Sequence, residues 1–215
     1  MSHVSSNLDI TVTEASRHLQ RLVDTGLIRK DSEGLYEVTL YGGLVLSLVP
    51  GLDFISRNRE YFSEHSVMVI PPKLRTRLGE LSAGRYISDT ITTVTHYWEI
   101  LNEAEEFAYS VKTSPLPTLY DEEAPVKAET RTILQDDIHL PEAFYFPEGI
   151  TRRFLKKVQI FLLVTEKEAI ISLPYMNGKV DYCSFTSKDP DFRGWCMDLF
   201  LHLWEEAKPN PSVTG

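Results

Sequence analysis

The clearest helical pattern lies near the N-terminus, in residues 12–24. Apolar side chains recur there at spacings of three and four, which predicts an amphipathic helix. The expected apolar side comprises Val12, Ala15, Leu19, Leu22 and Val23. Thr11 and Glu14 have the spacing of a capping box at its start, and Gly26 follows its end. The opposite side carries an Arg/Gln/Arg surface that we expect to face solvent.

Two short apolar runs follow this helix, at 27–30 and 35–39. They flank the turn-forming sequence Asp31-Ser32-Glu33-Gly34. This order predicts a β-hairpin with a charged tip.

An apolar stretch interrupted by Gly42-Gly43 and Pro50-Gly51 comes next. Its pattern predicts a linking helix over 43–62, kinked near Pro50, followed by a short helix from Pro71-Pro72 through Leu81. The apolar positions at helical spacing are Leu44, Val45, Leu48, Leu52 and Ile55. They form either a dimer seam or an ordinary packing surface between domains, and the pattern leaves both open.

Helical and strand patterns alternate beyond residue 85. We expect a helix at 90–106 and another at 190–207, strands at 107–112, 129–135, 141–146, 157–164 and 168–173, and a mobile loop at 114–125. The first helix is expected to turn Val94, Trp98, Leu101 and Ala104 inward. The last carries an apolar stripe of Phe192, Trp195, Cys196, Leu199, Phe200, Leu203 and Trp204, typical of core or dimer packing.

These elements predict a chain of the α+β or α/β class with three parts. Residues 1–42 form a partial winged helix-turn-helix, 43–84 form linking helices, and 85–215 form a mixed α/β sheet domain for regulation or dimerisation.

A helix followed by a short hairpin is the order of a winged helix-turn-helix, whose helix meets base edges in the major groove while the hairpin approaches the backbone. Candidate DNA contacts are Thr13, Ser16, Arg17, His18, Gln20 and Arg21 on the helix, and Lys30 and Ser32 on the hairpin. Arginine suits guanine or phosphate, and glutamine suits adenine. The same pattern also fits an ordinary solvated helix beside a hairpin.

The run EASRHLQRLVDTGLIRKDSEGLYEVTLYG resembles the recognition helix and wing of archaeal winged-helix regulators. REYFSEH (59–65), RTRLGEL (75–81), TEKEAIISLP (165–174), GKVDY (178–182) and DPDFRGWCMDLFLHLWEEAKP (189–209) resemble the subgroup that carries the methanogenesis-regulatory C-terminal domain, of the type found in an archaeal filamentation regulator. The resemblance spans nearly the whole chain. It implies sequence-specific binding of double-stranded DNA by a homodimer that is tuned through its C-terminal domain.

One departure from that family concerns the N-terminal helices. A winged helix of this kind has two helices before the recognition helix, whereas Val4 to Leu8 fit only the end of the second, with residues 9–11 as the turn. Leu19, Leu22 and Val23 would then lack their usual cover, at a cost of roughly 1.5–3 kcal/mol for each exposed side chain. We expect a second subunit or the C-terminal domain to supply that cover, or a DNA-binding unit that is impaired.

The net charge of −9 excludes a general nucleic-acid coat protein, which needs a strong positive field. Even residues 1–62 hold six Arg or Lys against eight Asp or Glu. No secretory signal or membrane span is predicted, and Cys183 and Cys196 are expected to be reduced thiols of a cytoplasmic protein.

No nucleotide-binding loop, nucleophile elbow or paired metal-ligand spacing occurs, so we expect no enzyme, no cofactor and no metal site. His18 and His65 are expected to be a surface and a packing residue. Because ligands of α/β sheets bind beyond strand carboxyl ends, Lys112 and Thr113 are candidates for binding a small-molecule effector. The alternative function is a ligand-binding or protein-interaction subunit that has lost independent DNA binding. A phosphodiesterase would rest on fold analogy alone.

Overall fold

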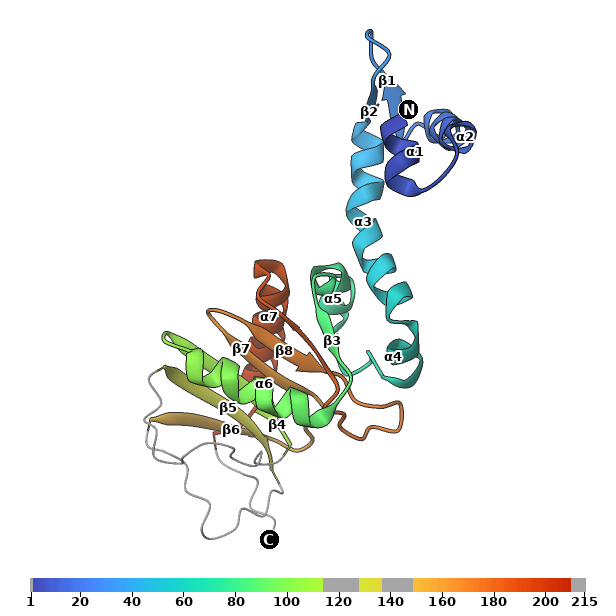
Figure 1. Cartoon of the computed structure of the whole chain (residues 1–215). Coiled ribbons are helices and arrows are strands. Elements are labelled where there is room, and N and C mark those ends of the chain that lie inside the picture. Colours follow the sequence, from blue (N-terminus) through green and yellow to red (C-terminus); the bar gives the residue numbers. More distant parts are fainter. Residues whose placement is uncertain (1, 114–127, 137–148, 210–215) are drawn as a thin grey trace. The chain divides into compact units, whose positions relative to one another are not determined.

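The chain forms two compact units, residues 1–52 and 53–215. The computed structural model, drawn in Figure 1, describes residues 2–113, 128–136 and 149–209. The predicted linking segment, 43–84, is divided between the two units. The predicted loop at 114–125 and the predicted strand at 141–146 lie outside the described residues.

The first unit has the predicted order of two helices and a hairpin. Helix α1 (Ser2–Leu8) is followed by α2 (Val12–Asp24), which has the bounds expected from its pattern. Strands β1 (Ile28–Lys30) and β2 (Tyr36–Val38) pair antiparallel, and α3 (Leu40–Arg57) begins directly after them.

The start and end of α2 are fixed by its own sequence. The Thr11 hydroxyl accepts a hydrogen bond from the Glu14 backbone N–H at 3.2 Å, and the Glu14 carboxylate accepts one from the Thr11 N–H at 3.0 Å. This is the predicted capping box. Gly26 has a φ of +74°, which favours glycine and lets the chain turn into β1.

The predicted apolar side of α2 is covered only in part. Ala15 is buried, and Leu19 and Val23 are half-buried. Leu22 is 38% exposed and Val12 is 54% exposed. The expected inward position of Val12 is therefore wrong, because α1 and β1 cover only a strip of the helix and Val12 lies to one side of it.

A tight local network joins the hairpin to α3. The Asp31 carboxylate accepts the backbone N–H groups of Glu33 and Leu35 at 2.9 and 2.8 Å, which closes the turn. The Thr39 hydroxyl donates to the Gly26 carbonyl at 2.6 Å and accepts from the Gly42 N–H at 2.9 Å. These bonds hold the first turn of α3 against the end of the hairpin.

The predicted helix at 43–62 proves to be two helices. Helix α3 begins at Leu40, includes Pro50 and ends at Arg57, and α4 (Arg59–Glu64) follows after Asn58. The Asn58 side chain donates to the Phe54 carbonyl at 2.9 Å and so satisfies part of the helix end. The short helix expected through Leu81 is also divided, into α5 (Pro72–Arg75) and the 3₁₀ helix η1 (Leu78–Leu81).

The second unit contains a seven-stranded mixed sheet in the order β3-β9-β8-β7-β4-β5-β6. Strands β4, β5 and β6 are parallel, and the remaining pairs are antiparallel, so the predicted mixed α+β class is confirmed. The strands are β3 (Arg85–Ile87), β4 (Phe107–Lys112), β5 (Glu129–Gln135), β6 (Ile150–Leu155), β7 (Phe161–Thr165), β8 (Ala169–Ser172) and β9 (Ser184–Ser187).

Strands β4 and β5 match their predicted bounds, whereas β3, β6 and β9 were not predicted. Strand β3 has only three residues, β6 carries two adjacent arginines and β9 reads Ser-Phe-Thr-Ser. None of the three has the apolar run or alternation that marks a strand in sequence. Tertiary pairing makes them strands.

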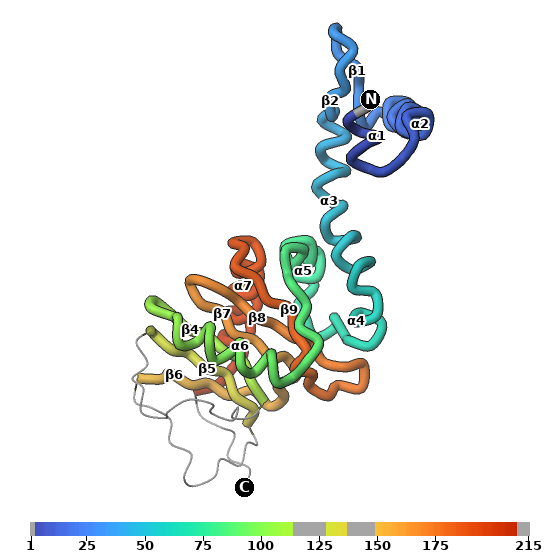
Figure 2. Tube along the Cα trace, viewed as in Figure 1, coloured from blue at the N-terminus to red at the C-terminus, as the bar shows by residue number. Residues whose placement is uncertain are grey.

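Helices cover both faces of the sheet, α6 (Thr90–Glu103) on one and α7 (Pro190–Glu206) on the other (Figures 1 and 2). Along β7, Phe161 and Leu163 join the core under α6, and Leu162 and Val164 join the core under α7. This two-sided burial explains why β7 and β8 read as continuous apolar runs.

The residues of α6 that were predicted to face inward do contact the core. Ala104 is buried, and Val94, Trp98 and Leu101 are half-buried and pack against the core under this helix. Thr93, Tyr97 and Ile100 are the residues that α6 buries completely. Thr93 can be buried despite its polar side chain because its hydroxyl forms a hydrogen bond with that of Ser184 at 3.1 Å.

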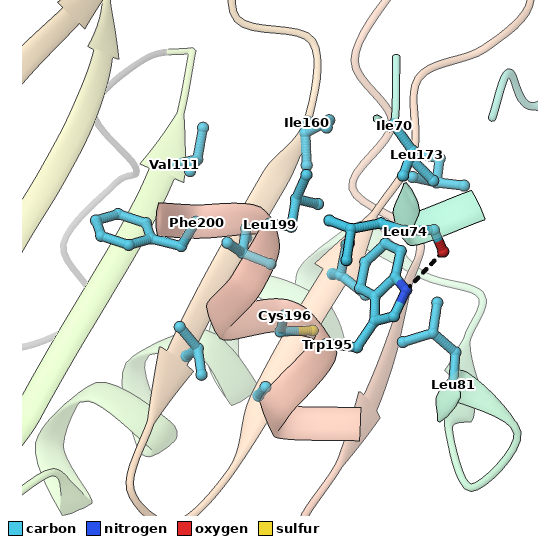
Figure 3. Close-up of a cluster of buried hydrophobic side chains, with 14 of the residues drawn as sticks. Ile70, Leu74, Leu81, Val111, Ile160, Leu173, Trp195, Cys196, Leu199 and Phe200 are labelled. Atoms are coloured by element: carbon cyan, nitrogen blue, oxygen red, sulfur yellow. Dashed lines mark hydrogen bonds between the residues drawn. The ribbon is translucent and has the colours of Figure 1, made fainter. Parts of the chain in front are cut away.

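The apolar stripe of α7 forms the centre of the larger core, as predicted. Phe192, Trp195, Cys196, Leu199 and Phe200 have no measurable exposure. Figure 3 shows the Trp195 indole N–H donating to the Leu74 carbonyl at 3.0 Å, which ties α7 to α5.

Candidate nucleic-acid interface

The outward side of α2 brings most of the predicted DNA-contact residues together. A shallow hollow of about 640 Å³ lies along this helix. Its lining consists of Val12, Thr13, Ser16, Arg17, Gln20, Arg21 and Asp24. Five of the six helix residues proposed from sequence therefore share one surface, and it is built from a single helix.

Two guanidinium groups dominate this surface. Arg17 and Arg21 are exposed, and neither forms an ion pair or a side-chain hydrogen bond with any residue in the described part of the chain. A guanidinium offers five donors in a planar fork that matches phosphate oxygens or the acceptor pair of guanine. Both arginines remain available for an anionic or base-edge partner.

Gln20 is held by an acidic neighbour that sequence reasoning did not include in the site. Its amide nitrogen donates to the Asp24 carboxylate at 2.8 Å. The bond orients the amide and leaves its oxygen as an acceptor on the hollow. It also places a negative charge beside Arg21, which weakens the attraction of this surface for phosphate. The i, i+4 spacing of Gln20 and Asp24 was the available signal.

His18, the sixth helix candidate, is exposed but does not line the hollow. It lies on the flank of α2 that carries Glu14. Hydrogen bonds from Thr11 hold the pKa of Glu14 below its ordinary value, and the charges of Arg17 and His18 act in the same direction. The start of α2 thus keeps a carboxylate, which its helix dipole favours.

The hairpin candidates lie on a separate surface. The Lys30 ammonium lies 5.2 Å from the centre of the Tyr36 ring, a cation–π distance. Ser32 is exposed in the turn, between Asp31 and Glu33. Arg29 is paired with Glu37 at 3.1 Å across the hairpin. The hairpin therefore offers phosphate one unpaired cation, Lys30, beside two carboxylates.

The effector candidates Lys112 and Thr113 lie at the carboxyl end of β4 in the second unit. The Lys112 ammonium is 5.8 Å from the Tyr97 ring centre, and the Thr113 hydroxyl lies 3.4 Å from that of Tyr182. Strand β4 pairs parallel with β5 and antiparallel with β7, so this end lies where the sheet changes direction. A hollow of about 750 Å³ in the same unit lies elsewhere, along α4 and β3, and sequence reasoning did not find it.

His65 is a buried packing residue with both ring nitrogens occupied. Nδ1 lies 2.7 Å from the Tyr61 carbonyl oxygen, and Nε2 lies 2.9 Å from the Asp181 carboxylate. The imidazole is stacked between the rings of Tyr61 and Tyr175. It has no nitrogen left for substrate or metal. Within the described ranges no group of three His, Cys, Asp or Glu side chains is arranged to hold a metal ion.

Among known proteins, this chain is similar in structure to an archaeal protein. No family model and no curated protein matches this chain. The solved structure of TrmBL2, described as an archaeal chromatin protein with a novel mode of DNA binding, matches with 14% identity and a TM-score of 0.45. The match covers 94% of this chain and 84% of that one.

No helix in the described part of the chain combines the length and the apolar character needed to cross a bilayer.

Proposed function

We propose that this chain is a DNA-binding transcription regulator in which α2 is the recognition helix and the β1–β2 hairpin is the wing. It acts as a homodimer, and a small molecule bound by the sheet unit controls it. The observation that carries the proposal is the α2 surface, on which Arg17, Gln20 and Arg21 lie side by side without any ion pair among the described residues.

The spacing of these side chains suits a helix in the major groove. Residues 13, 17, 20, 21 and 24 follow one another at steps of four, three, one and three, so they form a continuous stripe along the helix. The groove is about 12 Å wide and admits a helix whose outward residues reach base edges. Helix α2 is amphipathic and projects its longest polar side chains from this stripe.

The charge balance favours base recognition over general attraction to DNA. Residues 1–52 contain four Lys or Arg and six Asp or Glu. Four of the carboxylates are engaged locally, those of Glu14, Asp24, Asp31 and Glu37. A unit with so weak a field binds DNA tightly only through directed contacts, which carry sequence information.

The topology of the sheet supports an effector site at the carboxyl end of β4. Ligands of open sheets bind beyond strand carboxyl ends, where the order of strands changes. Lys112 supplies a cation there, and Thr113 supplies a hydroxyl. We propose these two residues as part of the effector site.

The test is binding of operator DNA selected from a random library, followed by fluorescence anisotropy. Arg17→Ala and Arg21→Ala should each weaken binding by about 1–3 kcal/mol, the usual contribution of a bidentate base contact. Arg59→Ala, in the second unit, is the matched control and should leave affinity unchanged. Full retention of operator binding by the Arg17/Arg21 double variant would refute α2 as the recognition helix.

A second candidate function has one observation in its favour, the acidic balance of the first unit. It is a ligand-binding or protein-interaction subunit without independent DNA binding. The same binding assay at low salt separates the two. If the folded, dimeric protein binds no genomic DNA fragment even at low salt, this second function is supported.

A further inference from the structure

The carboxyl end of β4 carries a lysine whose charge no described residue balances. Lys112 shares its face of β4 with Ala108, which lies in the core under α6, and it is half-buried there. Its ammonium lies 5.8 Å from the centre of the Tyr97 ring, and it forms no ion pair or hydrogen bond with any described residue. A cation that is partly withdrawn from water without an anionic partner loses hydration that nothing in the fold replaces. An anionic ligand would supply the missing partner.

Tyr97 adds a buried hydroxyl to the same region. The residue is 1% exposed in α6, yet its hydroxyl forms no hydrogen bond within the described chain. Its oxygen is nevertheless not completely covered, so a small molecule can reach it. Buried hydroxyls are nearly always hydrogen-bonded in folded proteins, and an exception calls for an explanation. A bound acceptor would satisfy this hydroxyl together with the ammonium of Lys112.

Two more hydroxyls lie at this end of β4. The Thr113 and Tyr182 oxygens are 3.4 Å apart, which is long for a hydrogen bond between hydroxyls, so either proton can turn to a ligand. The Tyr182 ring packs on Phe161 with ring centres 5.3 Å apart, and Phe161 packs on Tyr97 at 5.4 Å. An aromatic cluster therefore joins the Thr113–Tyr182 pair to the ring beside which the Lys112 ammonium lies.

We propose that the effector is a small organic carboxylate and that it binds at the β4 cluster, which consists of Tyr97, Lys112, Thr113 and Tyr182. The inference rests on the proposed function, in which a small molecule bound by the sheet unit controls the protein. One ammonium matches the single charge of a carboxylate, and the hydroxyls can donate to its two oxygens. The half-buried side chains of Val180 and Tyr182 offer an apolar surface to the rest of the molecule.

The donors of the β4 cluster favour a carboxylate over a phosphate or a neutral ligand. A phosphate group carries nearly two negative charges at neutral pH, and proteins usually bind it with arginine or with several backbone N–H groups. The β4 cluster instead offers the ammonium of Lys112 and the hydroxyls of Tyr97, Thr113 and Tyr182. A neutral ligand would leave the ammonium without an anion. A carboxylate satisfies both the charge and the hydroxyls.

Calorimetric titration of the full chain tests the class of ligand. Benzoate is the probe, benzamide is its neutral counterpart, and inorganic phosphate represents the other class of anion. The wild type should bind benzoate with a dissociation constant of about 1 mM, as expected for a ligand of so few atoms. It should bind benzamide about tenfold more weakly or less, because the amide lacks the charge. No binding of benzoate at about 20 mM, or tighter binding of phosphate or benzamide, would overturn the proposal.

Two substitutions and a matched control locate the binding of benzoate. Lys112→Met removes the charge and keeps an apolar stem, so it should weaken binding by about tenfold or more, and Tyr97→Phe should weaken it by about fivefold. Lys156→Met removes an exposed lysine of the same unit and should leave the affinity unchanged. Without ligand, Lys112→Met and Tyr97→Phe should unfold at no lower temperature than the wild type, because the groups they remove have no hydrogen-bond partner in the described chain. Equal affinity of the Lys112 and Lys156 variants for benzoate would refute the site.

The outcomes also separate this site from the proposed function. Benzoate binding that depends on Lys112, in a protein that binds no operator DNA, supports the carboxylate site and refutes the DNA-binding regulator. Operator binding by a protein whose Lys112 variant still binds benzoate as the wild type does refutes the carboxylate site alone.

Discussion

Arg17 and Arg29 are the same residue type on the same small unit, and their surroundings give them different roles. Arg29 is neutralised by Glu37 across the hairpin, whereas Arg17 forms no ion pair within 4.0 Å among the described residues. From the sequence, Arg17 was a candidate DNA contact and Arg29 was not. The pairing of Arg29 with Glu37 depends on their cross-strand register, which only the folded hairpin fixes.

The carboxylate of Asp24 yields a prediction about affinity. Asp24→Asn removes a negative charge from the α2 hollow and should strengthen operator binding by about 1 kcal/mol per subunit at low salt, or roughly fivefold. Asp9→Asn is the control, since Asp9 is an exposed carboxylate of the same unit that does not line the hollow. Titration by anisotropy at low and high salt measures the difference. Weaker binding of the Asp24 variant would show that the carboxylate itself accepts from a base.

Glu166 yields a prediction about stability and pH. Its carboxylate accepts backbone N–H bonds from Glu105, Glu106 and Phe107 at 2.9, 3.3 and 3.3 Å. Burial alone would raise the pKa of Glu166, but these N–H bonds outweigh it and hold the pKa below the ordinary value. A lowered pKa stabilises the fold above the unfolded pKa of about 4.3, and that stabilisation is lost as pH falls through the folded pKa.

We therefore expect Glu166→Gln to reduce the free energy of unfolding by about 1–3 kcal/mol at pH 7. The difference in free energy of unfolding between variant and wild type should shrink as the pH is lowered below 4.5, the ordinary pKa of this side chain. Urea unfolding across pH measures it. Glu105→Gln, which affects only an exposed pair with Lys167, should cost less than about 1 kcal/mol. A gap that is constant with pH would contradict the role of the charge.

In helix α3, the adjacent residues Gly42 and Gly43 differ in how much space surrounds them. A Cβ on Gly42 would lie 1.9 Å from the Leu27 carbonyl oxygen, whereas a Cβ on Gly43 would meet nothing within 4 Å. The sequence pattern treated the pair as a break before a helix. In the structure both residues lie inside α3, and Gly42 is where the helix contacts the end of the hairpin.

Two alanine variants test this contact. Gly42→Ala should destabilise the first unit by about 1–3 kcal/mol or more, because backbone must shift to admit the methyl group. Gly43→Ala should stabilise it by about 0.5–1 kcal/mol, since alanine favours an exposed helix position. Both changes in stability can be measured by hydrogen exchange of the hairpin amides and by thermal unfolding. Equal effects of the two substitutions would show that the helix and hairpin do not touch here.

For the whole molecule, the net charge of −9 and the sparse cations of the first unit should set the salt dependence of the proposed DNA binding. Arg17, Arg21 and Lys30 are the cations of that unit that have no ion pair in the described structure. Two copies give six such charges, so log K against log salt should have a slope near −5 on duplex DNA. The slope is obtained by measuring the affinity for DNA at salt concentrations from about 50 to about 300 mM. A value near −10 would show that the second unit also binds phosphates.

Local interactions account for the parts that the sequence determined. The bounds of α2 follow from its capping box and Gly26, which act within a few residues of the chain. The stripe of α7 and the strands β4 and β5 follow from apolar periodicity that burial requires. The arginine surface of α2 could likewise be placed by helical geometry alone.

The other features of the fold were decided only by tertiary structure, because the residues whose contacts produce them lie far apart in the sequence. Strands β3, β6 and β9 exist through pairing with partners that already form a sheet. Burial of the polar Thr93 in α6 is matched by a hydrogen bond with Ser184, which lies 91 positions away in the chain. Free energy from such long-range contacts overrides local propensity, so no pattern within a short window of the sequence could have revealed them.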